Sequence, residues 1–154
     1  MSFLLACQLS DRIAAVASVT GSMTPQIFSS CDPKHPTPVL QIHGTTDDVV
    51  PYGGAGWTKP IEAVTDYWIN YNKCNKEGTT TVLPDTNPND GSTVEHILYE
   101  GGTDGVVTQH YKVLGGGHTW PGAGVGNGRT NYDIEAVDII WAFFDRYDMD
   151  GVRE

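Results

Sequence analysis

Two short apolar runs constrain the fold of this chain more than any other feature of its sequence. Residues 13–19 (IAAVASV) and residues 39–43 (VLQIH) have the length of strands and are apolar almost throughout. Strands covered on both faces have this pattern, and they are typical of parallel sheets that carry helices on each side. We therefore expect a buried sheet as the centre of the fold.

The other segments alternate between helix and strand patterns, which indicates the α/β class. No internal repeat, low-complexity tract or linker interrupts them, so residues 1–154 are predicted to form one domain. Residues 20–38 and 122–128 are expected to be loops. Helices are predicted over residues 1–10 and 58–73, and from a capping-box pattern at 130–133 through Tyr147. Further strands are predicted at residues 79–83, 94–99 and 106–114, the last two as a hairpin.

Composition and charge exclude several classes of partner. The 154 residues are 39% hydrophobic and 18% charged, which fits a folded chain with a real core. The formal net charge of −10 argues against binding to a nucleic-acid backbone or to an anionic membrane surface. No segment approaches the roughly 20 apolar residues of a membrane span, and the first residues lack the basic start of a secretion signal. Neither a nucleic-acid nor a membrane partner is expected.

Polar residues with catalytic potential follow two of the predicted strands. Asp47 and Asp48 come after the run at 39–43, and His118 follows three glycines at the end of the strand at 106–114. In open α/β sheets, sites form at the carboxyl ends of strands. A histidine can move a proton near neutral pH, and a carboxylate can orient it. The pattern predicts two members of a nucleophilic triad, with the acid before the histidine in the chain.

Two metal sites are alternatives to this interpretation. His43, Asp47, Asp48 and His118 are residue types that bind zinc or manganese, although their spacing matches no specific site. The acidic loop at residues 85–91 resembles a calcium loop, but its sixth position is Asp90 instead of glycine and its twelfth is His96 instead of glutamate. We expect no metal and no cofactor, and we expect His43 to be a strand-end residue that helps hold the loop carrying Asp47.

The two loops, read with their neighbours, resemble one esterase family. It includes poly(3-hydroxybutyrate) depolymerases and feruloyl and acetylxylan esterases. Residues 43–52 (HGTTDDVVPY) resemble the acid loop of this family, and residues 115–122 (GGGHTWPG) resemble its histidine loop. Residues 5–17 are similar to the segment that follows its nucleophile, and residues 139–144 to its closing helix. The resemblance covers nearly the whole chain, and the histidine loop is its most specific part.

The resemblance implies a role for each matching residue. Asp47 would be the orienting acid and His118 the general base of a Ser-His-Asp ester hydrolase. Asp48 stands where the family commonly has proline, so either carboxylate could face the imidazole. Trp120 and Tyr52 would lie near the mouth of the substrate pocket, with plain packing as the alternative role. Polyester, feruloyl and acetyl substrates remain alternatives, and a secreted or periplasmic location is implied by the resemblance alone.

One departure from the family concerns the nucleophile. No Gly-x-Ser-x-Gly pattern occurs in the 154 residues. The resemblance therefore implies the C-terminal portion of an α/β-hydrolase fold, with a mostly parallel sheet, flanking helices and a nucleophilic serine upstream of Met1. The chain alone would then be inactive. The alternative is a non-catalytic binding or assembly domain that retains a relic acid–histidine pair.

Two further expectations concern cysteines and association. Cys7, Cys31 and Cys74 allow at most one intrachain disulfide, and spacing does not select the pair. Some relatives pair a cysteine at the position of Cys74 with one near residues 101–102, which are glycines here. The resemblance thus implies a free Cys74, or its pairing with Cys31. In the complete fold the strand at 13–19 would be interior, so its free edge predicts a homo-oligomer.

Overall fold

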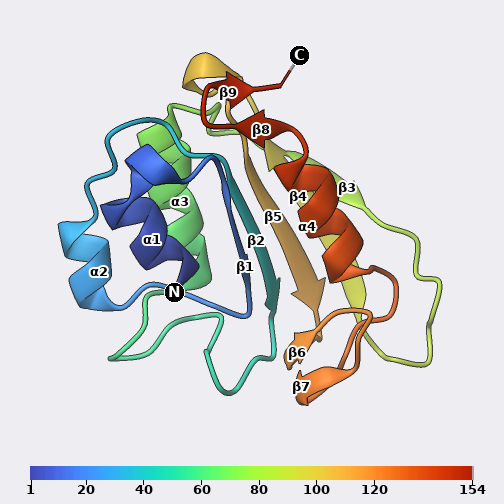
Figure 1. Cartoon of the computed structure of the whole chain (residues 1–154). Helices are drawn as coiled ribbons and strands as arrows, with labels where there is room; N and C mark the ends of the chain where they lie inside the picture. The colour runs from blue at the N-terminus through green and yellow to red at the C-terminus, as the bar shows by residue number, and fades with distance from the viewer. Residues whose placement is uncertain (154) are drawn as a thin grey trace.

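A five-stranded sheet forms the centre of the protein in a computed structural model that describes residues 1–153 (Figure 1). Its spatial order is β1-β2-β5-β4-β3. The strands are β1 (Val16–Val19), β2 (Val39–Gly44), β3 (Thr79–Val82), β4 (Thr93–Tyr99) and β5 (Thr108–Leu114). Both apolar runs of the sequence thus become neighbouring strands, and β1 lies at one edge of the sheet.

The sheet is mixed, which corrects the expectation of a mostly parallel one. Strands β1, β2 and β5 run parallel to one another, whereas β4 is antiparallel to both β5 and β3. The connection from β4 to β5 is residues 100–107, and a parallel crossover needs about a dozen residues or more. The short connection therefore forces the hairpin that the sequence predicted here.

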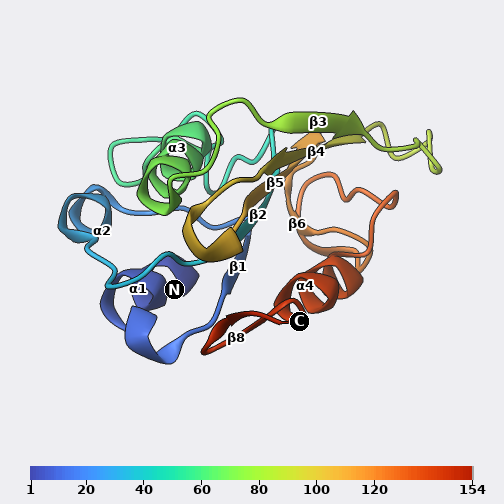
Figure 2. The same ribbon diagram turned by 90° about the horizontal axis from the view of Figure 1, so that it is seen from above.

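Helices cover both faces of the sheet (Figure 2). Three of them lie on one face, and the fourth lies on the other face against β1 and β2. They are α1 (Ser2–Gln8), α2 (Pro25–Ser30), α3 (Ile61–Asn72) and α4 (Ala136–Phe144). No helix among residues 1–153 has the length and apolar character needed to cross a membrane.

Strand β2 is buried along its whole length and contributes to both faces. Leu40 and Ile42 join the apolar cluster under α4, whereas Val39 joins the cluster under α1 and α3. Side chains alternate along a strand, so Gln41 and His43 point to the same face as Val39. Both are fully covered, at 2% and 0% exposure. Two polar side chains are thereby enclosed next to the end of β2.

The segment expected to be a loop at residues 20–38 contains α2. Thr24 caps this helix, because its Oγ1 accepts a hydrogen bond from the Ile27 amide at 3.2 Å. Pro25 occupies the first turn, where its missing N–H carries no cost. Thr24 and Pro25 mark the start of a helix, but the many prolines of residues 20–38 led to the prediction of a loop.

The last helix is shorter at both ends than the sequence predicted. It begins at Ala136 and not near Thr130, because Asp133, the expected acidic position of the capping box, is engaged elsewhere. One Asp133 oxygen accepts hydrogen bonds from the amides of Thr86 and Asn87 at 2.7 and 3.0 Å. The helix ends at Phe144, and a terminal hairpin follows. Its strands are β8 (Tyr147–Asp148) and β9 (Gly151–Val152).

Cys7 and Cys31 form a disulfide that joins α1 to the residue after α2. Cys74 is a buried free thiol, as the resemblance implied, and its alternative pairing with Cys31 is wrong. The two cysteines are 24 positions apart in the sequence. The loop that their disulfide closes restricts the unfolded chain, and this restriction stabilises the fold by about 3 kcal/mol.

Candidate active site

Two loops meet at the carboxyl ends of the adjacent parallel strands β2 and β5 (Figure 1). The Thr45 amide donates to the Val113 carbonyl, and the Thr46 amide donates to the Gly116 carbonyl, both at 2.9 Å. A Cβ on Gly44 would lie 2.2 Å from the carbonyl oxygen of Gly116, so no larger residue allows this approach. Gly44 and the glycine run therefore bring the acid loop against the histidine loop.

Asp47 is the buried acid of this junction, with 4% of the residue exposed. Its Oδ1 accepts hydrogen bonds from the amides of Val49 and Val50 at 2.9 and 2.8 Å. Its Oδ2 lies 2.9 Å from Nδ1 of His118. The turn that follows the strand thus holds one carboxylate oxygen and leaves the other for the imidazole.

His118 begins a small hairpin that the sequence did not predict, formed by β6 (His118–Trp120) and β7 (Val125–Asn127). Its side chain is 28% exposed. Because Nδ1 faces a carboxylate, the neutral form of the ring carries its hydrogen on Nδ1 and has its lone pair on Nε2. Within residues 1–153, Nε2 has no hydrogen-bond partner. The imidazole is oriented as a proton acceptor at the surface of the site.

Asp48, the other candidate acid, makes no hydrogen bond or ion pair with His118 in the described residues. It is exposed, and its Oδ1 accepts a hydrogen bond from the side-chain amide Nδ2 of Asn127 on β7 at 3.4 Å. Of the two carboxylates, Asp47 is the one that contacts the imidazole.

His43 lies directly behind Asp47. Its Nε2 is 3.2 Å from Asp47 Oδ2 and donates to the Val50 carbonyl at 2.9 Å. Gln41 Nε2 lies 3.0 Å from His43 Nδ1. Burial lowers the pKa of His43 below its usual value, so the ring is neutral near neutral pH. The sequence predicted that His43 is a strand-end residue that helps hold the acid loop, with a metal ligand as the alternative. Its direct contact with Asp47 is visible only in the folded structure.

The two aromatic residues predicted near the pocket mouth lie apart. Trp120 is 37% exposed and lines a cavity of about 350 Å³ with residues of β1 and α4. Tyr52 lines a smaller cavity of about 180 Å³ with residues of α3, and its hydroxyl is 3.2 Å from His110 Nε2. The structure places them in separate cavities that share no lining residue.

His110 is a buried histidine that the sequence analysis missed. It is 3% exposed, and burial lowers its pKa to about 3. The same burial raises the pKa of Tyr52 well above its usual value. Both groups are therefore neutral across the physiological range, and their contact supports the acid loop from the α3 side. Strand register alone could have placed His110 on the face of Gln41, its partner in β2.

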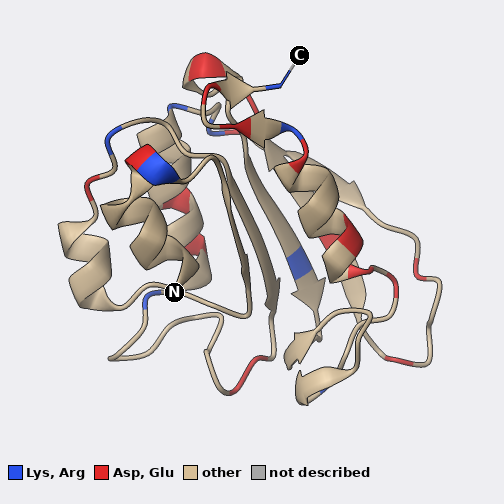
Figure 3. Cartoon of the chain, in the orientation of Figure 1, with Lys and Arg blue, Asp and Glu red and all other residues tan. Residues whose placement is uncertain are grey.

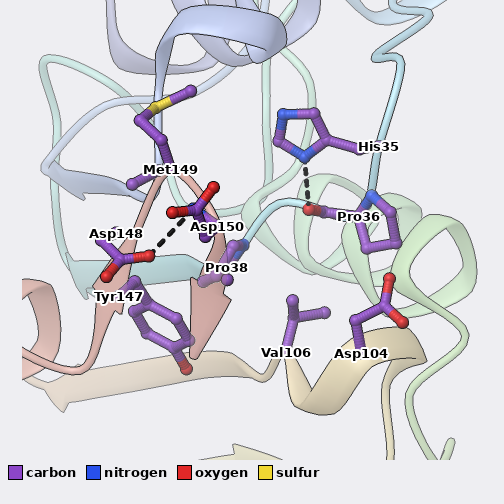
Figure 4. Close-up of a pocket in the computed structure, with 11 residues that line it drawn as sticks. His35, Pro36, Pro38, Asp104, Val106, Tyr147, Asp148, Met149 and Asp150 are labelled. Atoms are coloured by element: carbon purple, nitrogen blue, oxygen red, sulfur yellow. Dashed lines mark hydrogen bonds between the residues drawn. The ribbon is translucent and has the colours of Figure 1, made fainter. Parts of the chain in front are cut away.

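A third cavity, of about 310 Å³, lies at the end of the strands opposite the candidate site (Figure 4). It is lined by residues near the amino ends of β2 and β5, including His35, Pro38 and Val106, and by the terminal hairpin. The His35 ring is engaged with the backbone carbonyls of Ser10 and Pro36. This cavity contains neither Asp47 nor His118.

Charged residues are spread over the chain rather than gathered into a basic patch (Figure 3). Among residues 1–153, no group of three or more histidine, cysteine, aspartate or glutamate side chains is arranged to hold a metal ion. The four residues considered as a zinc or manganese site instead make the contacts described above.

Comparison with known proteins gives two distant relatives, and no protein-family model matches the chain. A bifunctional acetylxylan esterase/xylanase of Neocallimastix patriciarum is 27% identical over 146 residues, which are 94% of this chain and 18% of that protein. A feruloyl esterase B of Piromyces equi is 30% identical over 140 residues, covering 87% of this chain and 24% of that protein. The chain spans a quarter or less of the length of these relatives. It is distantly related to fungal acetylxylan and feruloyl esterases.

Proposed function

We propose that this chain is part of a serine carboxylic-ester hydrolase, with His118 as general base and Asp47 as orienting acid. The observation that carries the proposal is the 2.9 Å contact between Asp47 Oδ2 and His118 Nδ1, with Nε2 directed outward. The distant relationship to acetylxylan and feruloyl esterases supports it. The hydrolysed bond would be an ester of the acetyl, feruloyl or poly(3-hydroxybutyrate) type.

The proposed chemistry follows from the orientation of the imidazole. Nε2 takes the proton of a serine hydroxyl as its oxygen attacks the ester carbonyl, and the imidazolium that forms is stabilised by Asp47. Nε2–H then returns the proton to the departing alcohol, which leaves an acyl-serine. Water, deprotonated in turn by Nε2, cleaves the acyl-serine and releases the acid.

The nucleophile belongs, in this proposal, to residues outside these 154. No serine of the chain stands in a Gly-x-Ser-x-Gly turn. Such a turn exposes the hydroxyl and supplies an oxyanion-hole amide, so its absence removes two components at once. In this proposal, the pair of acid and base is completed only by a segment upstream of Met1.

Trp120 is the aromatic side chain that we propose to contact the acyl or aryl group of the substrate. It is two residues from His118 on the same hairpin, and it is partly exposed beside a cavity. An aromatic face of this kind covers a large apolar area at low entropic cost. The role of Tyr52 in substrate binding stays a prediction.

The experiment that tests this function compares two proteins. We expect the 154-residue chain to hydrolyse a short-chain p-nitrophenyl ester at the background rate. A protein expressed from the reading frame extended upstream of Met1 is expected to turn the ester over. An extended frame without Gly-x-Ser-x-Gly, or an extended protein that is inactive on acetyl, feruloyl and 3-hydroxybutyrate esters, would favour the binding or assembly alternative.

The free edge of β1 leads us to propose self-association of the 154-residue chain. Strand β1 is hydrogen-bonded to β2 on one side and has no strand on its other side within residues 1–153. An unpaired edge offers backbone donors and acceptors to another strand. Light scattering of the purified chain should report a dimer or a larger species, and a monodisperse monomer would contradict this expectation.

A further inference from the structure

The acid of the site is held by a buried pair, Gln41 and His43, of which the sequence predicted only that His43 helps hold the acid loop. Gln41 and His43 are alternate residues of β2 on the face of α1 and α3, at 2% and 0% exposure. Burying polar side chains costs free energy unless they are paired. Their contacts run in one line from the loop after β1 to the carboxylate of Asp47.

The contacts of Gln41 fix the protonation of the imidazole next to it. Its Nε2 lies 3.0 Å from the carbonyl oxygen of Gly21 and 3.0 Å from His43 Nδ1. A carbonyl can only accept, so the amide NH₂ group must occupy this position and must donate to both partners. His43 Nδ1 is therefore the unprotonated nitrogen of its ring.

The other nitrogen of the ring gives the same answer independently. His43 Nε2 faces two oxygens, the Val50 carbonyl at 2.9 Å and Asp47 Oδ2 at 3.2 Å. Both are acceptors, so Nε2 must carry the hydrogen. The ring is locked as the neutral Nε2–H tautomer, and its N–H dipole is directed at the end of the acid loop.

We infer that His43 is a positioning residue, whose Nε2–H group, with its tautomer set by Gln41, holds Asp47 in register with His118. The amides that bind Asp47 Oδ1 belong to the same turn and move with it. His43 instead belongs to β2, the rigid element beneath the turn. It ties the Val50 carbonyl and Oδ2 to the strand, so that Oδ2 meets His118 Nδ1 at a fixed place.

This inference rests on the proposed function, in which Asp47 orients the general base, but its test requires no catalysis. The measured quantity is the tautomer of His118, read from the ¹⁵N shifts of its ring nitrogens in the 154-residue chain over a pH series. In its neutral form, a free histidine prefers the Nε2–H tautomer. Positioned by Asp47, His118 is expected to be the Nδ1–H tautomer, with a protected low-field Nδ1–H resonance.

Three variants separate positioning from mere packing. His43→Leu keeps the volume apolar and is expected to abolish the low-field resonance and to shift His118 toward Nε2–H. His43→Gln retains a donor near the position of Nε2 and is expected to restore the Nδ1–H tautomer. Gln41→Met removes the group that sets the tautomer of His43 and is expected to broaden the resonance. If His43→Leu does not fold, the other two variants test the inference. It requires the Nδ1–H tautomer of His118 in His43→Gln and a broadened resonance in Gln41→Met.

The matched control is His96→Leu. His96, which is partly buried, is like His43 a strand histidine bonded to a glutamine, because its Nε2 lies 3.0 Å from Gln109 Oε1. It makes no hydrogen bond with the acid loop in the described residues. This control should leave the spectrum of His118 unchanged. If folded His43→Leu keeps the Nδ1–H tautomer, or if His43→Gln fails to restore it, the inference is wrong. An extended protein without esterase activity would refute the proposed function and leave this result standing.

Discussion

His118→Ala is expected to reduce ester hydrolysis by the protein extended upstream of Met1 about 10⁴-fold in kcat, with little change in KM. The imidazole is the one group in the described chain that is oriented by a buried carboxylate and exposed at its other nitrogen. Without it, the serine hydroxyl has no proton acceptor and the leaving alcohol has no proton donor. Initial rates on a short-chain p-nitrophenyl ester measure the effect.

The matched control for this loss is His96→Ala. It removes an imidazole of comparable burial on β4, away from the site. The rate should stay within about twofold of the unaltered protein, as is usual for changes outside a site. Equal losses in both variants would assign the effect to folding and not to catalysis. A His118→Ala protein that retains most of its activity would show that the general base is a different residue.

Asp47→Asn is expected to lower kcat by roughly 10⁴-fold while the fold persists. The amides of Val49 and Val50 require an oxygen at the position of Oδ1, so the new NH₂ group takes the place of Oδ2. There it faces Nδ1 of His118 as a donor. The imidazole must then accept at Nδ1 and carry its proton on Nε2, which is the wrong tautomer for a base.

The control for this change is Asp48→Asn, at the neighbouring carboxylate. Asp48 is exposed and contacts Asn127 at 3.4 Å, so its neutralisation should leave kcat essentially unchanged. The rates of the two variants, with circular dichroism to confirm folding, distinguish the acids. Loss of activity in Asp48→Asn with no loss in Asp47→Asn would show that Asp48, and not Asp47, orients His118.

The fold was predictable where local pattern and topology agree. The runs at 13–19 and 39–43 predicted buried strands, and they form β1 and β2. The hairpin β4–β5 followed from a connection too short for a crossover. The same connection should have predicted the mixed sheet, but the resemblance to a mostly parallel fold outweighed it. The early start predicted for α4 failed because Asp133 binds the amides of Thr86 and Asn87, which are distant in the chain.

The candidate site was predictable in its parts and not in its connections. Asp47 and His118 stand out because each follows a strand at the same sheet edge, next to glycines. The sequence left Asp47 and Asp48 as alternatives, and the geometry of the turn after β2 separates them. The role of His43 depends on a buried amide two residues earlier and on a carbonyl seven residues later, Val50. Such contacts exist only once the strand and the loop are packed.

The measurement that tests the account most directly is covalent labelling by diisopropyl fluorophosphate, followed by peptide mass spectrometry. The protein extended upstream of Met1 should carry one phosphoryl adduct, on a serine that precedes Met1, with fluoride released. His118→Ala should slow the labelling strongly, and the 154-residue chain should remain unlabelled. Absence of an adduct in the extended protein, or an adduct on a serine between Ser2 and Ser92, would contradict the assignment of Asp47 and His118 to an upstream serine.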